Sequence, residues 1–196
     1  MNRSRGLLVA VGSVVVATLV GGSASAKSSK SKREDEVARK LVTQVAGIKA
    51  GDHVVIMADV EDMALADALQ ISVMQQGAYP LAVISRQAFF KRYYDQVPAS
   101  YDAKPASWGS KLAAQADVRI LVERDQDPSA FKDVSEERLM ATSKKLIGPY
   151  NTMIERNVRM VSLGNGLFPT KVTARKLGLS KAQLEKIFWA GVNTAY

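Results

Sequence analysis

The sequence predicts a single α/β domain with a largely parallel sheet of at least four strands and helices on both faces. Two observations lead to this fold class. Short apolar runs alternate along the chain with longer segments of helical periodicity. In addition, residues 51–85 contain a complete strand–helix–strand unit. Two strands joined by a helix must run parallel, with a right-handed crossover, so this unit sets the direction of the sheet.

Within this unit, residues 54–57 are apolar and β-branched at three of four positions, as expected of a strand covered on both faces. The next segment has apolar residues at three- and four-residue spacing, which predicts one helical stripe made of Met63, Ala66, Leu69, Val73 and Met74. Gly77 occupies the position of a C-cap glycine. A second apolar run over residues 81–84 predicts the next strand.

An amphipathic helix is predicted over residues 34–48, with a buried face made of Val37, Leu41, Val45 and Ile48. Residues 97–108 contain two prolines and predict a loop. The third strand is predicted at residues 118–123, where Arg119 interrupts the apolar pattern, and the fourth at residues 158–163.

The predicted helix after the third strand is long. Asp133 and Ser135 are candidate N-caps for a helix that continues to Glu155. Gly148 and Pro149 are expected to break or kink it, because proline lacks a backbone donor.

After the fourth strand, Gly164, Asn165 and Gly166 match no phosphate-binding loop and predict a turn. Ser180 and Gln183 form a capping box that starts the last helix. Its predicted buried face consists of Leu184, Ile187, Phe188 and Gly191.

The amino terminus predicts export. Two arginines precede an apolar run over residues 7–20, and small residues end at Ala26, a pattern typical of a secretory signal peptide over residues 1–26. The alternative is an uncleaved membrane anchor. With cleavage after Ala26, residues 27–33 form a flexible basic spacer and residues 34–196 form the domain. We therefore expect a periplasmic or extracellular protein without a stable membrane anchor.

Composition excludes several kinds of chemistry. The chain has no cysteine, which excludes a cysteine triad and a lipoprotein anchor, and a serine triad would depend on its single histidine, His53. The predicted signal peptide holds two of the 27 basic residues and none of the 19 acidic ones, which leaves a modest net charge of +6. Lone histidines at strand starts are usually structural, and we expect no metal role for His53.

Phe89, Phe90, Tyr93 and Tyr94 alternate with basic residues, a combination that can stack nucleotides. No known nucleotide-stacking module is recognisable, so we predict a helical stripe packed against the sheet and no nucleic-acid partner.

Asp59, Glu61 and Asp62 cluster at the carboxyl end of the first strand, where α/β sheets bind ligands. They are candidates to face a ligand, either a cation or an amine. The alternative is an ordinary acidic N-cap and first turn of the following helix. No other residues suggest a catalytic or metal-binding set.

Four segments in order carry a family resemblance: IKAGDHVVI at 48–56, GAYP at 77–80, FPT at 168–170 and LGLSKAQLE at 177–185. They resemble the amino-terminal domain of the thermophilic metalloaminopeptidases, the aminopeptidase T and aminopeptidase S group. Ala50, Phe168 and Lys171 depart from the family pattern, which has proline, tyrosine and proline there.

The resemblance implies metal-dependent peptide hydrolysis by a second domain. In this family two glutamates, two histidines, a tyrosine and an aspartate bind the metal ions, all in the carboxy-terminal domain. No position here inherits such a role, so zinc, cobalt or manganese is implied only together with a second domain. A peptide substrate and a homodimer are implied in the same way.

Three functions follow from these observations. The first is an exported aminopeptidase-like protein that lacks the metal-binding domain, either as a fragment or as a non-catalytic part. The second is a free-standing exported binding or interaction module without peptidase activity. The third is an α/β enzyme that uses Asp59, Glu61 and Asp62 with a metal.

Overall fold

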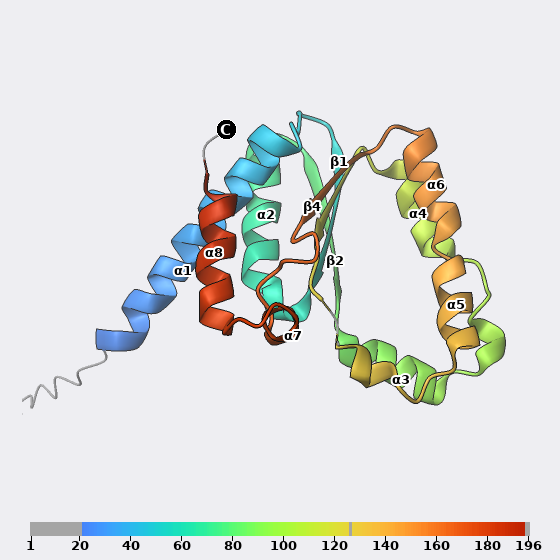
Figure 1. The fold of residues 1–196 in the computed structure, drawn as a ribbon. Helices are drawn as coiled ribbons and strands as arrows, with labels where there is room; N and C mark the ends of the chain where they lie inside the picture. Colours follow the sequence, from blue (N-terminus) through green and yellow to red (C-terminus); the bar gives the residue numbers. More distant parts are fainter. Residues whose placement is uncertain (1–20, 126, 195–196) are drawn as a thin grey trace, which may run out of the picture.

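The computed structural model describes residues 21–125 and 127–194. Its centre is a four-stranded sheet with the order β2-β1-β3-β4, in which every neighbouring pair is parallel. This confirms the predicted fold class (Figure 1). The strands are β1 (His53–Asp59), β2 (Tyr79–Ser85), β3 (Val118–Val122) and β4 (Arg159–Leu163).

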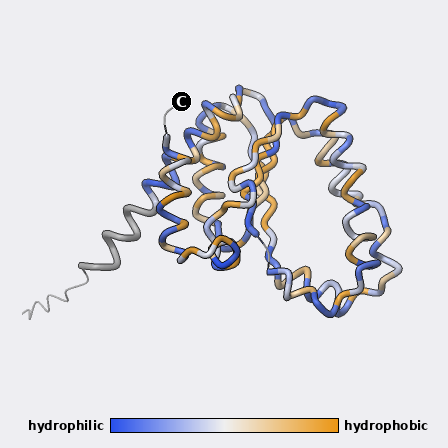
Figure 2. The backbone as a smooth tube through the Cα atoms, viewed as in Figure 1, coloured by the Kyte–Doolittle hydropathy of each residue, from blue (hydrophilic) through white to orange (hydrophobic). Residues whose placement is uncertain are grey.

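β1 is an inner strand because it pairs with β2 on one side and with β3 on the other. It continues through α2 (Met63–Gln75) into β2 on one side, as the strand–helix–strand pattern predicted, and it pairs with β3 on the other. Hydrophobic residues lie along these strands (Figure 2). Because β1 and β3 are parallel neighbours, the polar connections that come after them emerge side by side at the carboxyl edge of the sheet.

One face of the sheet is covered by helices and a short π-helical segment (Figure 1). Val54, Ile56, Val118 and Ile120 point into this side and are at most 1% exposed. Close packing of branched side chains against helices makes this the main core of the domain. The covering elements are α1 (Gly21–Lys40), the π-helical segment η1 (Leu41–Val45), α2, α7 (Lys171–Lys176) and α8 (Lys181–Val192).

The first helix differs from the prediction at both ends. α1 (Gly21–Lys40) extends upstream of the expected start at Glu34. It gives way to η1, in which the amide of Ala46 donates to the carbonyl of Leu41 at 2.8 Å. This bond spans five residues, so the helix is locally wider and its face shifts. Val45, expected in the core, is consequently 55% exposed, whereas Val42 and Ala46 are buried.

The predicted buried stripe of α2 is confirmed at Ala66, Leu69 and Val73. The prediction is wrong at the two ends of the stripe, where Met63 and Met74 are exposed. On α8 the face is rotated from the predicted one. Ile187 is 60% exposed and Gly191 is also exposed, whereas Leu184 is buried. The residues that pack on the core with Leu184 are Phe188, Trp189 and Val192. The predicted capping box of Ser180 and Gln183 is present.

The second face of the sheet is covered by α4 (Ser107–Gln115) and α6 (Ile147–Glu155), which form a smaller core with it. Other helical elements extend beyond this face (Figure 1). Residues 97–108, predicted as a loop, include a short 3-10 helix and the first residues of α4. The extending elements are α3 (Gln87–Gln96), η3 (Ala99–Tyr101), η4 (Pro128–Phe131) and α5 (Glu136–Lys144).

The long helix predicted to run to Glu155 is two helices, α5 and α6, which separate at Lys145 and Leu146. Ser135 is the N-cap of α5 and accepts from the amide of Arg138, as predicted. The break precedes Pro149, which lies in the first turn of α6. A first-turn proline loses no intrahelical hydrogen bond, so the interruption moves upstream of it.

The aromatic residues of α3 do not pack against the sheet as predicted, and α3 buries none of its residues. The Tyr93 hydroxyl donates instead to Asp102 at 2.7 Å, and Tyr94 packs on Phe131. Arg138 joins this cluster through a 2.6 Å ion pair with Asp102. The helices beyond the second face are therefore held together by a polar cluster in place of a hydrophobic core.

No helix among residues 21–125 and 127–194 is long and apolar enough to cross a membrane. The apolar run at residues 7–20, on which the signal-peptide prediction depends, lies outside the described residues. The division into signal peptide, spacer and domain stays a prediction.

Candidate functional site

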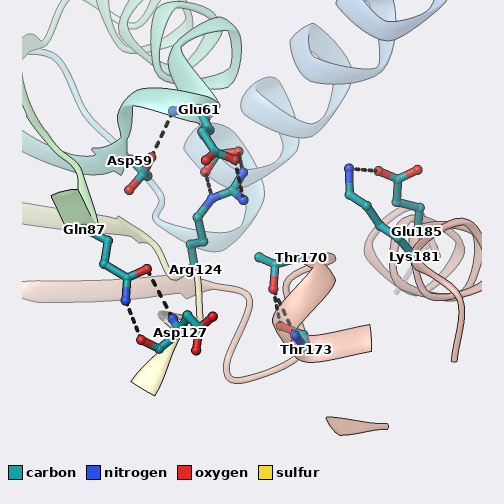
Figure 3. A network of polar contacts seen from close by, with 10 residues as sticks. Asp59, Glu61, Gln87, Arg124, Asp127, Thr170, Thr173, Lys181 and Glu185 are labelled. Atoms are coloured by element: carbon teal, nitrogen blue, oxygen red, sulfur yellow. Dashed lines mark hydrogen bonds and ion pairs between the residues drawn. The ribbon is translucent and has the colours of Figure 1, made fainter. Parts of the chain in front are cut away.

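The candidate site lies at the carboxyl edge of the sheet, between the ends of β1 and β3. The chain leaves β1 toward β2 on one side, whereas β3 pairs on its other side. Such a change of direction opens a crevice where parallel α/β sheets characteristically bind ligands. Asp59, Glu61 and Asp62 follow β1. Arg124 follows β3, and its guanidinium lies against Glu61 (Figure 3).

In the turn after β1, Asp59 has a different role from Glu61 and Asp62. Asp59 is the N-cap of the 3-10 helix η2 (Val60–Asp62), and its Oδ1 accepts from the amide of Glu61 at 3.0 Å. A short acidic side chain satisfies the free amides at such a helix start. Asp59 therefore has a capping role, as the alternative interpretation of this cluster predicted.

Arg124 binds the other two carboxylates. Its Nε and Nη2 donate to Asp62 at 2.8 and 2.7 Å, and its Nη1 lies 3.0 Å from Glu61. Burial disfavours the charged form of Arg124, but the hydrogen bonds to Asp62 and the nearby acidic charges outweigh it and raise the pKa of Arg124. The bidentate geometry fixes the start of α2 to the end of β3.

A polar cavity of about 540 Å³ opens beside this ion-pair cluster. It is lined by residues from five connections, and cationic side chains are prominent among them: Arg86, Arg124, Lys171 and Lys181. Lys181 pairs with Glu185 at 3.1 Å. Within residues 21–125 and 127–194, Arg86 and Lys171 form no ion pair. The cavity therefore offers the cations of Arg86 and Lys171, together with the carboxylate of Asp59, to a charged ligand.

Two hydrogen-bonded pairs hold the rim of the cavity (Figure 3). The Gln87 amide nitrogen donates to the carbonyl of Asp127 at 2.6 Å, and the amide of Asp127 donates back to Gln87 at 3.2 Å. The Thr170 hydroxyl accepts from the amide of Thr173 at 3.0 Å and so caps α7. The cap precedes Lys171, the first residue of α7, which lines the cavity.

His53 lies at the opposite end of β1 from Asp59, about 20 Å away at the usual rise of about 3.3 Å per strand residue. Its ring stacks on Tyr79, and its Nδ1 is 3.4 Å from a carboxylate oxygen of Asp117. The histidine therefore cannot join the acidic cluster in acid–base or metal chemistry.

The turn at Gly164, Asn165 and Gly166 is confirmed, with the amide of Leu167 donating to the carbonyl of Gly164 at 2.9 Å. Gly164 has a φ of 131°, and a Cβ there would lie 2.4 Å from the carbonyl oxygen of Glu123. Glycine is thus required by the close approach of two chain segments.

Sequence reasoning missed Arg124, the residue that organises the site. It is the second residue after β3, so the parallel topology places it opposite Glu61 and Asp62. A charged residue just past the carboxyl end of an inner strand was the available signal.

A family model described as "Thermophilic metalloprotease (M29)" matches residues 30–193. The chain belongs to this family. The family resemblance inferred from the four sequence segments is thereby confirmed. No match was found among curated proteins.

Among solved structures, wild-type AmpT from Thermus thermophilus is similar, with a TM-score of 0.63 and 16% sequence identity. The similarity covers 82% of this chain and 42% of AmpT, so the chain spans less than half of that protein's length. At this level of identity the similarity establishes the fold.

The metal expected of a metalloprotease does not fit the side chains at this edge. In the described part of the chain, no three residues among histidine, cysteine, aspartate and glutamate are grouped to hold an ion. Asp62 and Glu61 face the guanidinium of Arg124, whose positive charge repels a cation. Co-catalytic metal centres need several converging ligands that this edge lacks.

Proposed function

We propose that this chain is a non-catalytic part of an exported aminopeptidase-like protein of the M29 family. The observation that carries this proposal is the ion-pair cluster at the ligand-binding edge of a family domain. Arg124 occupies the carboxylates of Asp62 and Glu61, the acidic groups best placed to bind a metal. The domain then contributes shape and contacts, and the metal ligands come from a second domain.

Export is part of this proposal. The basic start, the apolar run at residues 7–20 and the small residues ending at Ala26 support cleavage after Ala26. The mature chain would begin at Lys27, and the domain at residue 34. A peptide substrate, a homodimer and a divalent metal belong to the complete protein under the same proposal.

A second candidate is a free-standing exported binding module. The observation in its favour is the polar cavity, where Arg86 and Lys171 have no ion-pair partner among the described residues. Under this candidate, the isolated domain binds a charged ligand with unchanged affinity whether or not a metal domain is present.

An aminopeptidase assay of residues 27–196 with added zinc, cobalt or manganese tests the main proposal. We expect no turnover of aminoacyl substrates, because attack on the peptide bond needs an activated water and a stabilised oxyanion. Metal-dependent turnover that survives repurification and is lost in Asp59→Ala or Glu61→Ala would contradict it. Such a result would favour the α/β enzyme that uses these carboxylates.

A further inference from the structure

A second cavity, of about 640 Å³, lies on the other side of the molecule between the second face of the sheet and helices α4 and α6. Its lining is mostly apolar and includes Val55, Val83, Leu112, Trp108, Tyr150 and Met153. Its volume is within the range of small-molecule sites. It is separate from the polar cavity at the carboxyl edge and shares no lining residue with it.

Arg119 is the charged residue that lines this cavity. On β3, Val118 and Ile120 point into the main core, whereas Arg119 pairs in register with Val55 on the second face. Its Nε donates to the thioether sulfur of Met57 at 3.3 Å, a weak acceptor. No carboxylate of the described residues lies within ion-pair distance of it.

Three other partly buried arginines have carboxylate partners. Arg124, Arg138 and Arg159 each donate to an aspartate, at Asp62, Asp102 and Asp52. A guanidinium beside an apolar wall is costly without an anionic partner, and an aliphatic residue would complete this wall at lower cost. Arg119 thus keeps its remaining donors available to a ligand in the cavity.

We propose that this cavity binds a monocarboxylate with an apolar alkyl body. The carboxylate accepts two hydrogen bonds from Arg119, which is the preferred geometry of guanidinium–carboxylate pairs. The alkyl chain lies along Val55, Val83 and Leu112 and removes their apolar surface from water. The ligand site is independent of the function proposed above, because it uses neither a metal nor the carboxyl edge.

Decanoate is the probe for this proposal, used below its micelle concentration with the mature chain, residues 27–196. Trp108 lines the cavity and is 76% exposed, whereas Trp189 packs on the opposite side of the sheet. In a Trp189→Phe background the remaining tryptophan reports on the cavity. We expect saturable binding with a blue shift of its emission, and matching affinity by calorimetry on the unmodified chain.

Arg119→Gln should weaken decanoate binding by about tenfold or more, which is the typical worth of a charge-assisted hydrogen-bonded pair. Arg119→Lys should retain part of the affinity. Arg92→Gln is the matched control, because Arg92 is an exposed arginine on α3 and should not affect binding. Val83→Phe should abolish binding by filling the cavity.

Three results would overturn the proposal. The first is no saturable binding of decanoate to a chain that melts cooperatively. The second is equal affinity in Arg119→Gln and Arg92→Gln. The third is equal affinity for decanoate and for decyltrimethylammonium. Binding that depends on the apolar wall alone would not distinguish the negative headgroup from the positive one.

Discussion

The two faces of the sheet are built from the same strands but are covered to different degrees. On the first face, Ile56 and Ile120 are fully buried beneath α1 and α2. On the second face, Met57 and Arg119 are partly exposed and line a cavity. The difference indicates that the first face supplies most of the stability of the domain, whereas the second face leaves room for a ligand.

The largest expected effect is a difference in unfolding free energy between equivalent substitutions on the two faces of the sheet. Leu69→Ala in α2 removes a fully buried side chain from the first core and should cost about 2–5 kcal/mol of unfolding free energy. The matched Leu112→Ala, at the wall of the second cavity, should cost about 1 kcal/mol, because solvent already reaches that site. Urea denaturation measures both, and equal losses would contradict the comparison.

A smaller difference in stability is expected between substitutions of Arg119, in β3, and Arg124, just after it. Arg124→Gln leaves Asp62 and Glu61 without their cation and should destabilise the domain by about 1–2 kcal/mol, a value limited by the 70% exposure of Glu61. Arg119→Gln breaks no ion pair and should stay within about 0.5 kcal/mol of the parent chain. Thermal melts at two salt concentrations measure both. A larger loss at Arg119 would mean that it is structural.

Helix capping sharpens the comparison further. Ser180→Ala removes the capping box of α8, which packs on the first core, and should cost about 1 kcal/mol of global stability. Ser135→Ala removes the cap of α5, which buries none of its residues. Its effect should be confined to local opening, seen as faster amide exchange in α5 with little change in global stability. Matching global losses would show that α5 is part of the core.

The last effect concerns the pH dependence of stability on the second side. Burial raises the pKa of Tyr93 to about 12, and the hydrogen bond to Asp102 acts in the same direction. A raised phenol pKa means that Tyr93 stabilises the fold fully below its ordinary value of 10.0, and that this contribution falls as the pH rises toward 12. Tyr93→Phe should make stability less dependent on alkaline pH in urea melts. An unchanged alkaline loss in Tyr93→Phe would assign it to other groups.

The sequence predicted the fold best for the strands and helices that bury most of their apolar residues against the sheet. The run at residues 54–57 and the stripe around Leu69 located β1, α2 and the parallel order, because burial on two faces leaves a strong pattern. The exposure of Val45 and Ile187 could not be foreseen. A single extra residue in the η1 turn, or a small rotation of α8, changes the buried face without changing composition.

The candidate site was predictable in position but not in chemistry. The sequence places Asp59, Glu61 and Asp62 at the carboxyl edge, yet it does not show which cation meets them. Arg124 lies 62 residues from Asp62 along the chain and reaches it only through the pairing of β1 with β3. Similarly, Arg119 appeared in the sequence as a break in a strand pattern, and only the packed helices show that it faces a cavity.

Metal binding by the mature chain is the most direct test of the proposal that the carboxyl-edge charges neutralise one another and do not bind a metal. Equilibrium dialysis of residues 27–196 against zinc, cobalt and manganese should give substoichiometric retention, unchanged in Asp62→Asn and Glu61→Gln. Retention of one or two ions per chain, lost in either variant, would contradict it. That result would show that the carboxylates leave Arg124 to coordinate metal and that this domain has a metal centre of its own.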